Sequence, residues 1–165
     1  MAMKFESLQD LFVHELREIL DAEQQLTKAL PKMIDAASLP YLKQKFTDHL
    51  KQSNELITNL EQVFAKRDMK AETLYSEGMA GLLKEGEPLF HAEGHPAVID
   101  TALIAFMRKI EYYEFSSFAA LRTYARALAL SSEVINLLVM KLRDETKSDE
   151  FITHIAEASV GKKAA

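Results

Sequence analysis

The chain has 165 residues, 48% of them hydrophobic, and a formal net charge of −5, which predicts one globular domain and excludes a disordered chain. The acidic balance argues against a general nucleic-acid binder, and the absence of cysteine excludes disulfides and thiolate chemistry. No apolar run approaches the roughly 20 residues of a membrane span, and residues 1–7 lack the apolar core of a signal peptide. We therefore expect a cytoplasmic protein with no nucleic-acid or membrane partner.

The first two helices are predicted by capping signals and by apolar residues at helical spacing. Ser7 and Asp10 form a Ser-x-x-Asp capping box, so a helix is expected to begin there. Pro31 is expected to kink the last turn of this helix. Residues 38–40 predict a short break, after which a second helix runs to about residues 66–68.

The segment between residues 71 and 95 differs in composition from the predicted helices, because four of the five glycines fall there. We expect one short helix near residues 74–84 within an irregular crossover. Pro96 fits the first turn of a third helix, with Asp100 near its positive end. That helix is expected to stop near residues 130–132, where a serine caps a fourth helix that continues through Ile155.

Four long helices with short links within each pair, and a longer crossover between the pairs, are typical of ferritin-like bundles. The sequence therefore predicts an all-α fold, an up-down four-helix bundle with a short extra helix in the crossover between helices 2 and 3. We expect a single bundle domain over residues 1–160 and a flexible C-terminal tail over residues 161–165.

Acidic residues lie on or near the apolar stripes of three of these helices. Glu23 is in the middle of the first stripe, because Phe12, Leu16 and Leu30 fall within about 20° of it on a helical wheel. The ordinary alternative is a helix-edge carboxylate that reaches water or pairs with a lysine. At mid-stripe this alternative is the weaker interpretation, since charged residues are seldom fully buried unless paired.

The third and fourth helices repeat the pattern. On the third helix Glu111 has several apolar residues, among them Phe115, within about 40°, and Glu114 lies about 60° to one side. On the fourth, Glu145 and Asp149 flank the apolar stripe, where they could instead form an acidic edge paired with basic neighbours. A Glu-x-x-Glu spacing alone is common on surface helices, so its value here is its position among apolar residues.

The second helix contributes no acid to its stripe, which centres near Ser53. Asn54 lies on one margin, His49 lies on the other, and Lys51 points well away. His49 is the histidine placed to reach a bundle core, and we interpret it as a partly exposed polar residue rather than a ligand.

Several carboxylates directed into one core require a positive group there, because an uncompensated buried charge is very costly. In an all-helical protein a pair of metal ions is the first candidate. Iron or manganese suits an oxygen-rich set better than copper or zinc. The predicted metal ligands are therefore Glu23, Glu111, Glu114, Glu145 and Asp149. No catalytic residue is assigned.

Five segments carry a family resemblance: residues 11–16, 21–26, 77–83 in the crossover, 100–105 and 111–115. They resemble the YciE/YciF family of bacterial ferritin-like proteins, and the similarity extends along nearly the whole chain. The resemblance implies a small stress-associated protein, mostly without an established activity in the family, whose bundle resembles rubrerythrin and carries a two-metal site. The family's Glu-His-Tyr-Glu becomes Glu111-Tyr112-Tyr113-Glu114, and its second-helix His-Leu-Glu-Glu-Thr becomes His49-Leu50-Lys51-Gln52-Ser53.

Two functions from different classes follow. The first is a metal-dependent redox protein of the stress response, with iron or manganese at the five acids and with Tyr112 or Tyr113 either an electron donor or ordinary core packing. The second is a structural or interaction protein whose metal site is lost to a salt-bridge network around Lys51, and the family departures at Lys51 and Asn54 support it. A homodimer is expected for either function, and iron storage in a large cage is the weaker alternative.

Overall fold

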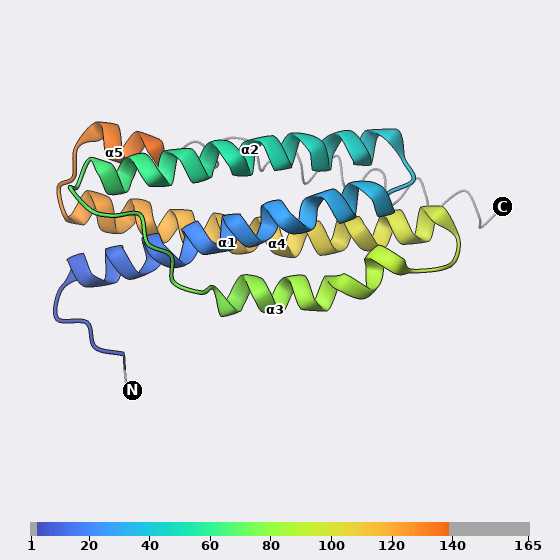
Figure 1. The fold of residues 1–165 in the computed structure, drawn as a ribbon, viewed down its shortest axis with the longest axis horizontal. Coiled ribbons are helices and arrows are strands. Elements are labelled where there is room, and N and C mark those ends of the chain that lie inside the picture. The colour runs from blue at the N-terminus through green and yellow to red at the C-terminus, as the bar shows by residue number, and fades with distance from the viewer. Residues whose placement is uncertain (1–2, 139–165) are drawn as a thin grey trace.

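The computed structural model describes residues 3–138, and over this range it contains helices and no strand. The elements are α1 (Leu8–Ala36), α2 (Pro40–Ala65), α3 (Glu77–Gly86), the 3₁₀ helix η1 (Glu87–His91), α4 (Pro96–Ala127) and α5 (Ser132–Leu137). Figure 1 shows α1, α2 and α4 lying side by side along the long axis, with the shorter α3 along one side of the bundle. The expected continuation of the fourth helix and the tail at 161–165 lie outside the described residues.

The helix ends confirm most of the local predictions. Ser7 caps α1 by accepting a hydrogen bond from the Asp10 amide at 3.1 Å, and Ser131 caps α5 by accepting one from the Val134 amide. Pro96 occupies the first turn of α4. The expected kink at Pro31 is not seen as an interruption, because α1 continues through this proline to Ala36.

Asp100 ties three helices together at one end of the bundle. This buried carboxylate on α4 accepts hydrogen bonds from the Ser38 amide at 2.7 Å, the Ser38 hydroxyl at 2.6 Å and the Leu39 amide at 3.0 Å. It thereby satisfies amides at the start of α2, whose N-terminus has no side-chain cap of its own. The end of α1, the start of α2 and the first turns of α4 therefore lie at the same position along the bundle axis.

The opposite end is fixed by contacts between residues far apart in the sequence. Lys66 at the end of α2 pairs with Glu133 of α5 at 2.6 Å, and Arg67 lies over the ring of Phe12 from α1. Between these two ends, α1 runs antiparallel to both α2 and α4, as the colours of Figure 1 show.

The core is one apolar cluster to which α1, α2 and α4 all contribute. The short crossover helix begins about three residues later than expected, at Glu77, because Ser76 supplies its cap. Its last residue, Gly86, lies against the ring of Phe106 on α4, where a Cβ atom would be 2.1 Å from the ring. This contact holds α3 close to the bundle.

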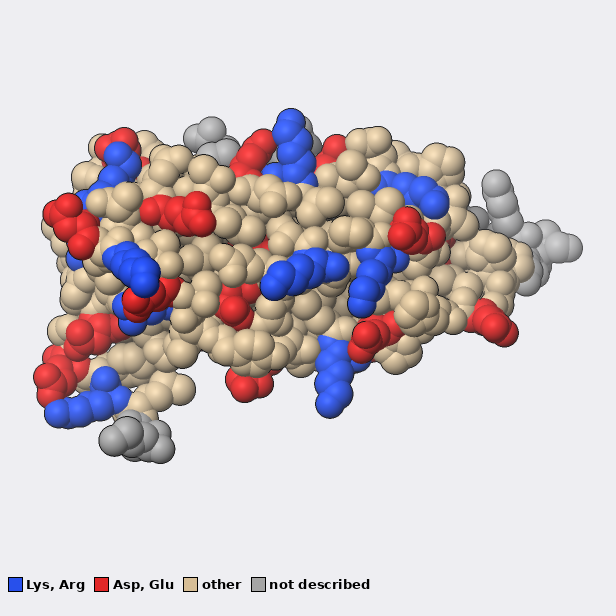
Figure 2. Space-filling model, in the orientation of Figure 1, with Lys and Arg blue, Asp and Glu red and all other residues tan. Residues whose placement is uncertain are grey.

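The surface in Figure 2 mixes basic and acidic side chains, without a large patch of one sign on that face. Within residues 3–138 no helix is long and apolar enough to cross a membrane. The large exposed hydrophobic residues include Val98, Tyr112 and Phe115 on α4, and on α2 they include Tyr41. The expected core-packing role is therefore wrong for Tyr112.

Candidate metal centre

Glu23 and Glu114 lie in the bundle core, and neither side chain is exposed to solvent. Their level can be estimated from the corner where Ser38 meets Asp100. Glu23 precedes Ser38 by about 15 residues and Glu114 follows Asp100 by about 14, so at about 1.5 Å per residue each lies roughly 21–23 Å from that corner. Two carboxylates from different helices thus occupy the same level of the bundle.

His49 reaches the same region from α2. Its Nε2 lies 3.3 Å from a carboxylate oxygen of Glu114, and its Nδ1 lies 4.0 Å from one of Glu111. The side chain of His49 is 8% exposed. The sequence-based interpretation of His49 as a partly exposed residue is therefore wrong, and its position beside Glu114 was not predicted.

The helical wheel places Glu111 closer than Glu114 to the centre of the buried face of α4, and the structure shows the opposite order. Glu114 is fully buried, whereas the side chain of Glu111 is 21% exposed. The wheel counts Phe115 as part of the stripe, yet Phe115 is 42% exposed. Without it, Ile110 and Phe118 place the centre of the stripe at Glu114. Single exposed apolar residues are common in folded proteins, so the residue type of Phe115 does not indicate that it lies outside the buried face.

The core-facing polar residues of α2 are His49 and Ser53, which lie one turn apart. Lys51 and Asn54 are both exposed, and Asn54 donates to the Leu50 carbonyl at 2.8 Å. A salt-bridge network centred on Lys51 is therefore not what the described structure contains. A regular alternation of three and four residues identifies the buried face of α2: Leu42, Phe46, His49, Ser53, Leu56, Leu60 and Val63.

Glu145 and Asp149 lie outside the described residues. Among residues 3–138, no group of three or more histidine or acidic side chains has the spacing to hold a metal ion. The donors that are present, two buried carboxylates, a third beside them and one imidazole, fit a hard cation such as iron or manganese in chemical type.

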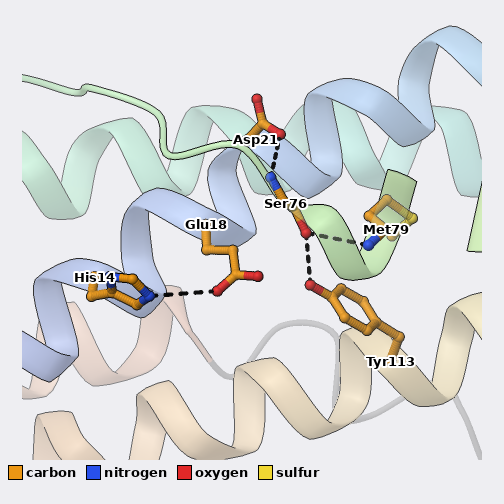
Figure 3. A network of polar contacts seen from close by, with 6 residues as sticks. All are labelled: His14, Glu18, Asp21, Ser76, Met79 and Tyr113. Carbon is orange, nitrogen blue, oxygen red and sulfur yellow. Dashed lines mark hydrogen bonds and ion pairs between the residues drawn. The ribbon is translucent and has the colours of Figure 1, made fainter. Parts of the chain in front are cut away.

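A second polar cluster lies between α1, α3 and α4 (Figure 3). The Ser76 amide donates to Asp21 at 2.8 Å, while the Ser76 hydroxyl shares a hydrogen bond of 2.8 Å with that of Tyr113 and accepts one from the Met79 amide. On the neighbouring turn of α1, His14 lies 3.9 Å from Glu18. These contacts anchor the crossover to both long helices, and they give Tyr113 a structural role.

Burial and neighbouring charge shift the pKa values of two groups, Tyr113 in this cluster and Glu15 on α1. Burial raises the pKa of the Glu15 carboxyl, and the negative charge of Glu18 raises it further, although His14 acts in the opposite direction. Burial also raises the pKa of Tyr113, the hydrogen bond with Ser76 opposes this, and the carboxylates of Glu18 and Glu15 add to it. Ionised Glu15 is therefore less favourable in the folded protein than in the unfolded chain.

We expect Glu15→Gln to stabilise the protein at pH 7 by about 0.5 kcal/mol, discounted because the side chain is partly exposed. Since the folded pKa is raised, the penalty is present when Glu15 is ionised and disappears as pH falls below the ordinary pKa of this carboxyl, 4.5. Urea unfolding at pH 7 and at about pH 4 measures the difference. Glu55→Gln, at an exposed position of α2, is the matched control; an equal gain in both variants would contradict the assignment.

The chain resembles known proteins along almost its full length. The model of a family described as a domain of unknown function, DUF892, matches residues 7–165. Protein YciF of Escherichia coli (strain K12) is 33% identical over 163 residues, which cover 98% of this chain and 98% of that protein.

Two solved structures share the fold. The E. coli stress protein YciF matches with a TM-score of 0.87 and 32% identity, covering 96% of this chain and 100% of that one. YcfI of Rhodopseudomonas palustris, described as a candidate structural protein, matches with a TM-score of 0.85 and 31% identity, covering 93% of this chain and 97% of that one.

The helix order and the packing, together with these matches, define an all-α protein of the ferritin-like bundle class, as predicted. Within that class the chain belongs to the DUF892 family. The resemblance to YciE and YciF proteins that its sequence indicates is confirmed.

Proposed function

We propose that this chain is a metal-binding stress-response protein whose bundle core binds iron or manganese. The observation that carries the proposal is the complete burial of Glu23 and Glu114 at one level of the bundle, with His49 beside Glu114. Full burial of acidic side chains is rare unless they are paired or coordinate a metal. The proposed ligands are drawn from the five acids of the sequence analysis and from His49.

The composition of α2 favours one ion per chain over two. Two neighbouring cations repel, and di-metal bundle sites usually combine a carboxylate from each of four helices with histidines. At the level of Glu23 and Glu114 the core-facing residues of α2 are His49 and Ser53, which bring no negative charge. When bound, iron would supply redox chemistry with oxygen or peroxide, while the carboxylates would hold it and the apolar core would limit access of water.

The relatives support the physiological part of the proposal. YciF of E. coli, which matches this chain over nearly its full length, is described as a stress protein. A homodimer belongs to the same proposal, because Tyr112 and Phe115 leave exposed aromatic surface on one face of α4. Light scattering gives the mass in solution, and a monomer at all concentrations would remove this part.

A second candidate function has its own observation in its favour. His49 already lies 3.3 Å from Glu114, so a protonated imidazole could balance the buried charge with no metal present. The chain would then be a structural or interaction protein that keeps the bundle without the chemistry. The description of YcfI as a candidate structural protein agrees with this alternative.

Metal content separates the two functions. The protein would be purified from cells supplied with iron or manganese and measured by plasma mass spectrometry, beside Glu114→Ala and a control, Glu77→Ala, at an exposed position on α3. We expect about one metal per chain in the wild type and the control, because carboxylate sites should fill under such mass action. Less than about 0.2 per chain in the wild type, unchanged in Glu114→Ala, would favour the structural alternative.

Chelation tests the same claim through stability. Because a ligand that binds the folded state stabilises it, removing the metal is expected to lower the melting temperature of the wild type by several degrees and to leave Glu114→Ala nearly unaffected. The measurement is differential scanning fluorimetry with and without a chelator. An unchanged wild-type melting temperature would count against the proposal.

A further inference from the structure

Ser53 is a polar residue in the core for which the fold itself offers no explanation. Its side chain is fully buried on α2, and its hydroxyl oxygen has no hydrogen-bond partner within residues 3–138. Burying a hydroxyl without a partner costs free energy, on the order of 1–3 kcal/mol. An alanine at this position would avoid that cost. The buried hydroxyl oxygen is therefore a candidate donor to a bound ligand.

Other helical hydroxyls of this chain behave differently. Thr47, Thr58 and Thr101 each donate to the carbonyl four residues earlier, at 2.8, 3.1 and 2.7 Å. This back-bond is the usual way for a serine or threonine inside a helix to satisfy its donor. Ser53 could adopt it by rotating one bond, yet in this structure its hydroxyl makes no such contact.

The position of Ser53 along the bundle coincides with that of the two buried carboxylates. Ser53 follows the corner formed by Ser38 and Asp100 by about 15 residues, which places it roughly 21–23 Å from that corner. Glu23 on α1 and Glu114 on α4 lie at the same estimated distance. Three helices therefore contribute one fully buried polar side chain each to a single layer of the core.

We propose that Ser53 is the direct oxygen ligand that α2 contributes to a cation bound between Glu23 and Glu114. The inference rests on the proposed function, and it adds a residue that the five acids and His49 do not include. A neutral hydroxyl is a suitable oxygen donor for a hard cation such as manganese or iron. It also agrees with a site for a single ion, because it adds no negative charge.

Cobalt binding to Ser53→Cys tests the contact directly. The chain contains no other cysteine, so a thiolate-to-cobalt charge-transfer absorption in this variant can come only from position 53. Thr58→Cys is the matched control, because it places a thiol on the exposed side of the same helix. We expect the charge-transfer absorption in Ser53→Cys and its absence in both Thr58→Cys and the wild type.

Ser53→Ala gives a second measurement that does not depend on the thiol. Without metal, this variant should melt roughly 3 °C higher than the wild type, because an unsatisfied buried hydroxyl is removed. With manganese as the probe, calorimetry should show affinity about tenfold weaker than that of the wild type, because one ligand is lost.

The outcomes separate the two proposals. If the wild type binds cobalt and manganese but Ser53→Cys gives no charge-transfer absorption and Ser53→Ala binds equally well, the role of Ser53 is overturned and the proposed function stands. If the wild type binds neither metal, the proposed function fails and the assignment of Ser53 fails with it.

Discussion

Gly86→Ala is expected to lower the free energy of unfolding by about 2–3 kcal/mol, because the added methyl group overpacks the contact between α3 and α4. The added Cβ would lie 2.1 Å from the ring of Phe106, which is itself buried in the core. Phe106 also packs edge-on against Phe90, with ring centroids 6.0 Å apart, so its ring has little room to move. Urea unfolding followed by circular dichroism measures the loss.

Gly81→Ala on the same helix is the matched control, because a Cβ atom added there would meet no neighbouring group within 4 Å. Alanine is preferred over glycine within a helix by up to about 1 kcal/mol, so this variant should be as stable as the wild type or more stable. If both variants lost the same free energy, the close packing of α3 against α4 would be contradicted.

His49→Leu is expected to destabilise the metal-free protein by about 3 kcal/mol. The change removes an imidazole that lies 3.3 Å from the fully buried carboxylate of Glu114 and leaves that carboxylate in the core. Adding Glu114→Gln should recover at least half of the loss, because the charge is then removed while the shape is kept. Urea unfolding in the presence of a chelator measures the free energy of unfolding of the wild type, the two single variants and the double variant.

His14→Leu is the control for this cycle. His14 also lies beside a carboxylate, that of Glu18 at 3.9 Å, but both side chains reach solvent. A pair of this kind is worth about 0.5 kcal/mol, so His14→Leu should have a small effect. A cost for His49→Leu no greater than that for His14→Leu would show that the buried pair does not stabilise the core.

The local features of the fold are predictable because each depends on a few neighbouring residues. Ser7, Pro96 and Ser131 mark helix starts through caps and fixed backbone angles, and the structure places the starts there. The role of Asp100 is not predictable in the same way. Its hydrogen bonds join it to residues about 60 positions away, and no local pattern indicates such a contact.

The candidate site is predictable where the acid stands among apolar residues and less so elsewhere. Glu23 is central on its wheel and is fully buried. The wheel places Glu114 to one side because it includes an exposed aromatic residue, Phe115, in the core stripe. A histidine that interrupts an apolar stripe is easily dismissed, although the spacing from Phe46 to Leu56 puts His49 on the buried face.

These observations connect the sequence to the proposed chemistry. The corner at Asp100 joins the end of α1, the start of α2 and the first turns of α4, and the shared apolar core holds these helices in register. That register brings Glu23 and Glu114 to one level, where α2 presents Ser53 and His49. The proposed cation is the group that would make such a layer favourable in an otherwise apolar core.

The most direct measurement is anomalous X-ray scattering from crystals grown with manganese. A cation bound in this layer predicts an anomalous peak in the core, about 2.0–2.6 Å from carboxylate oxygens of both Glu23 and Glu114. Crystals that contain manganese in the solvent but show no peak at this layer, with His49 still paired to Glu114, would contradict it.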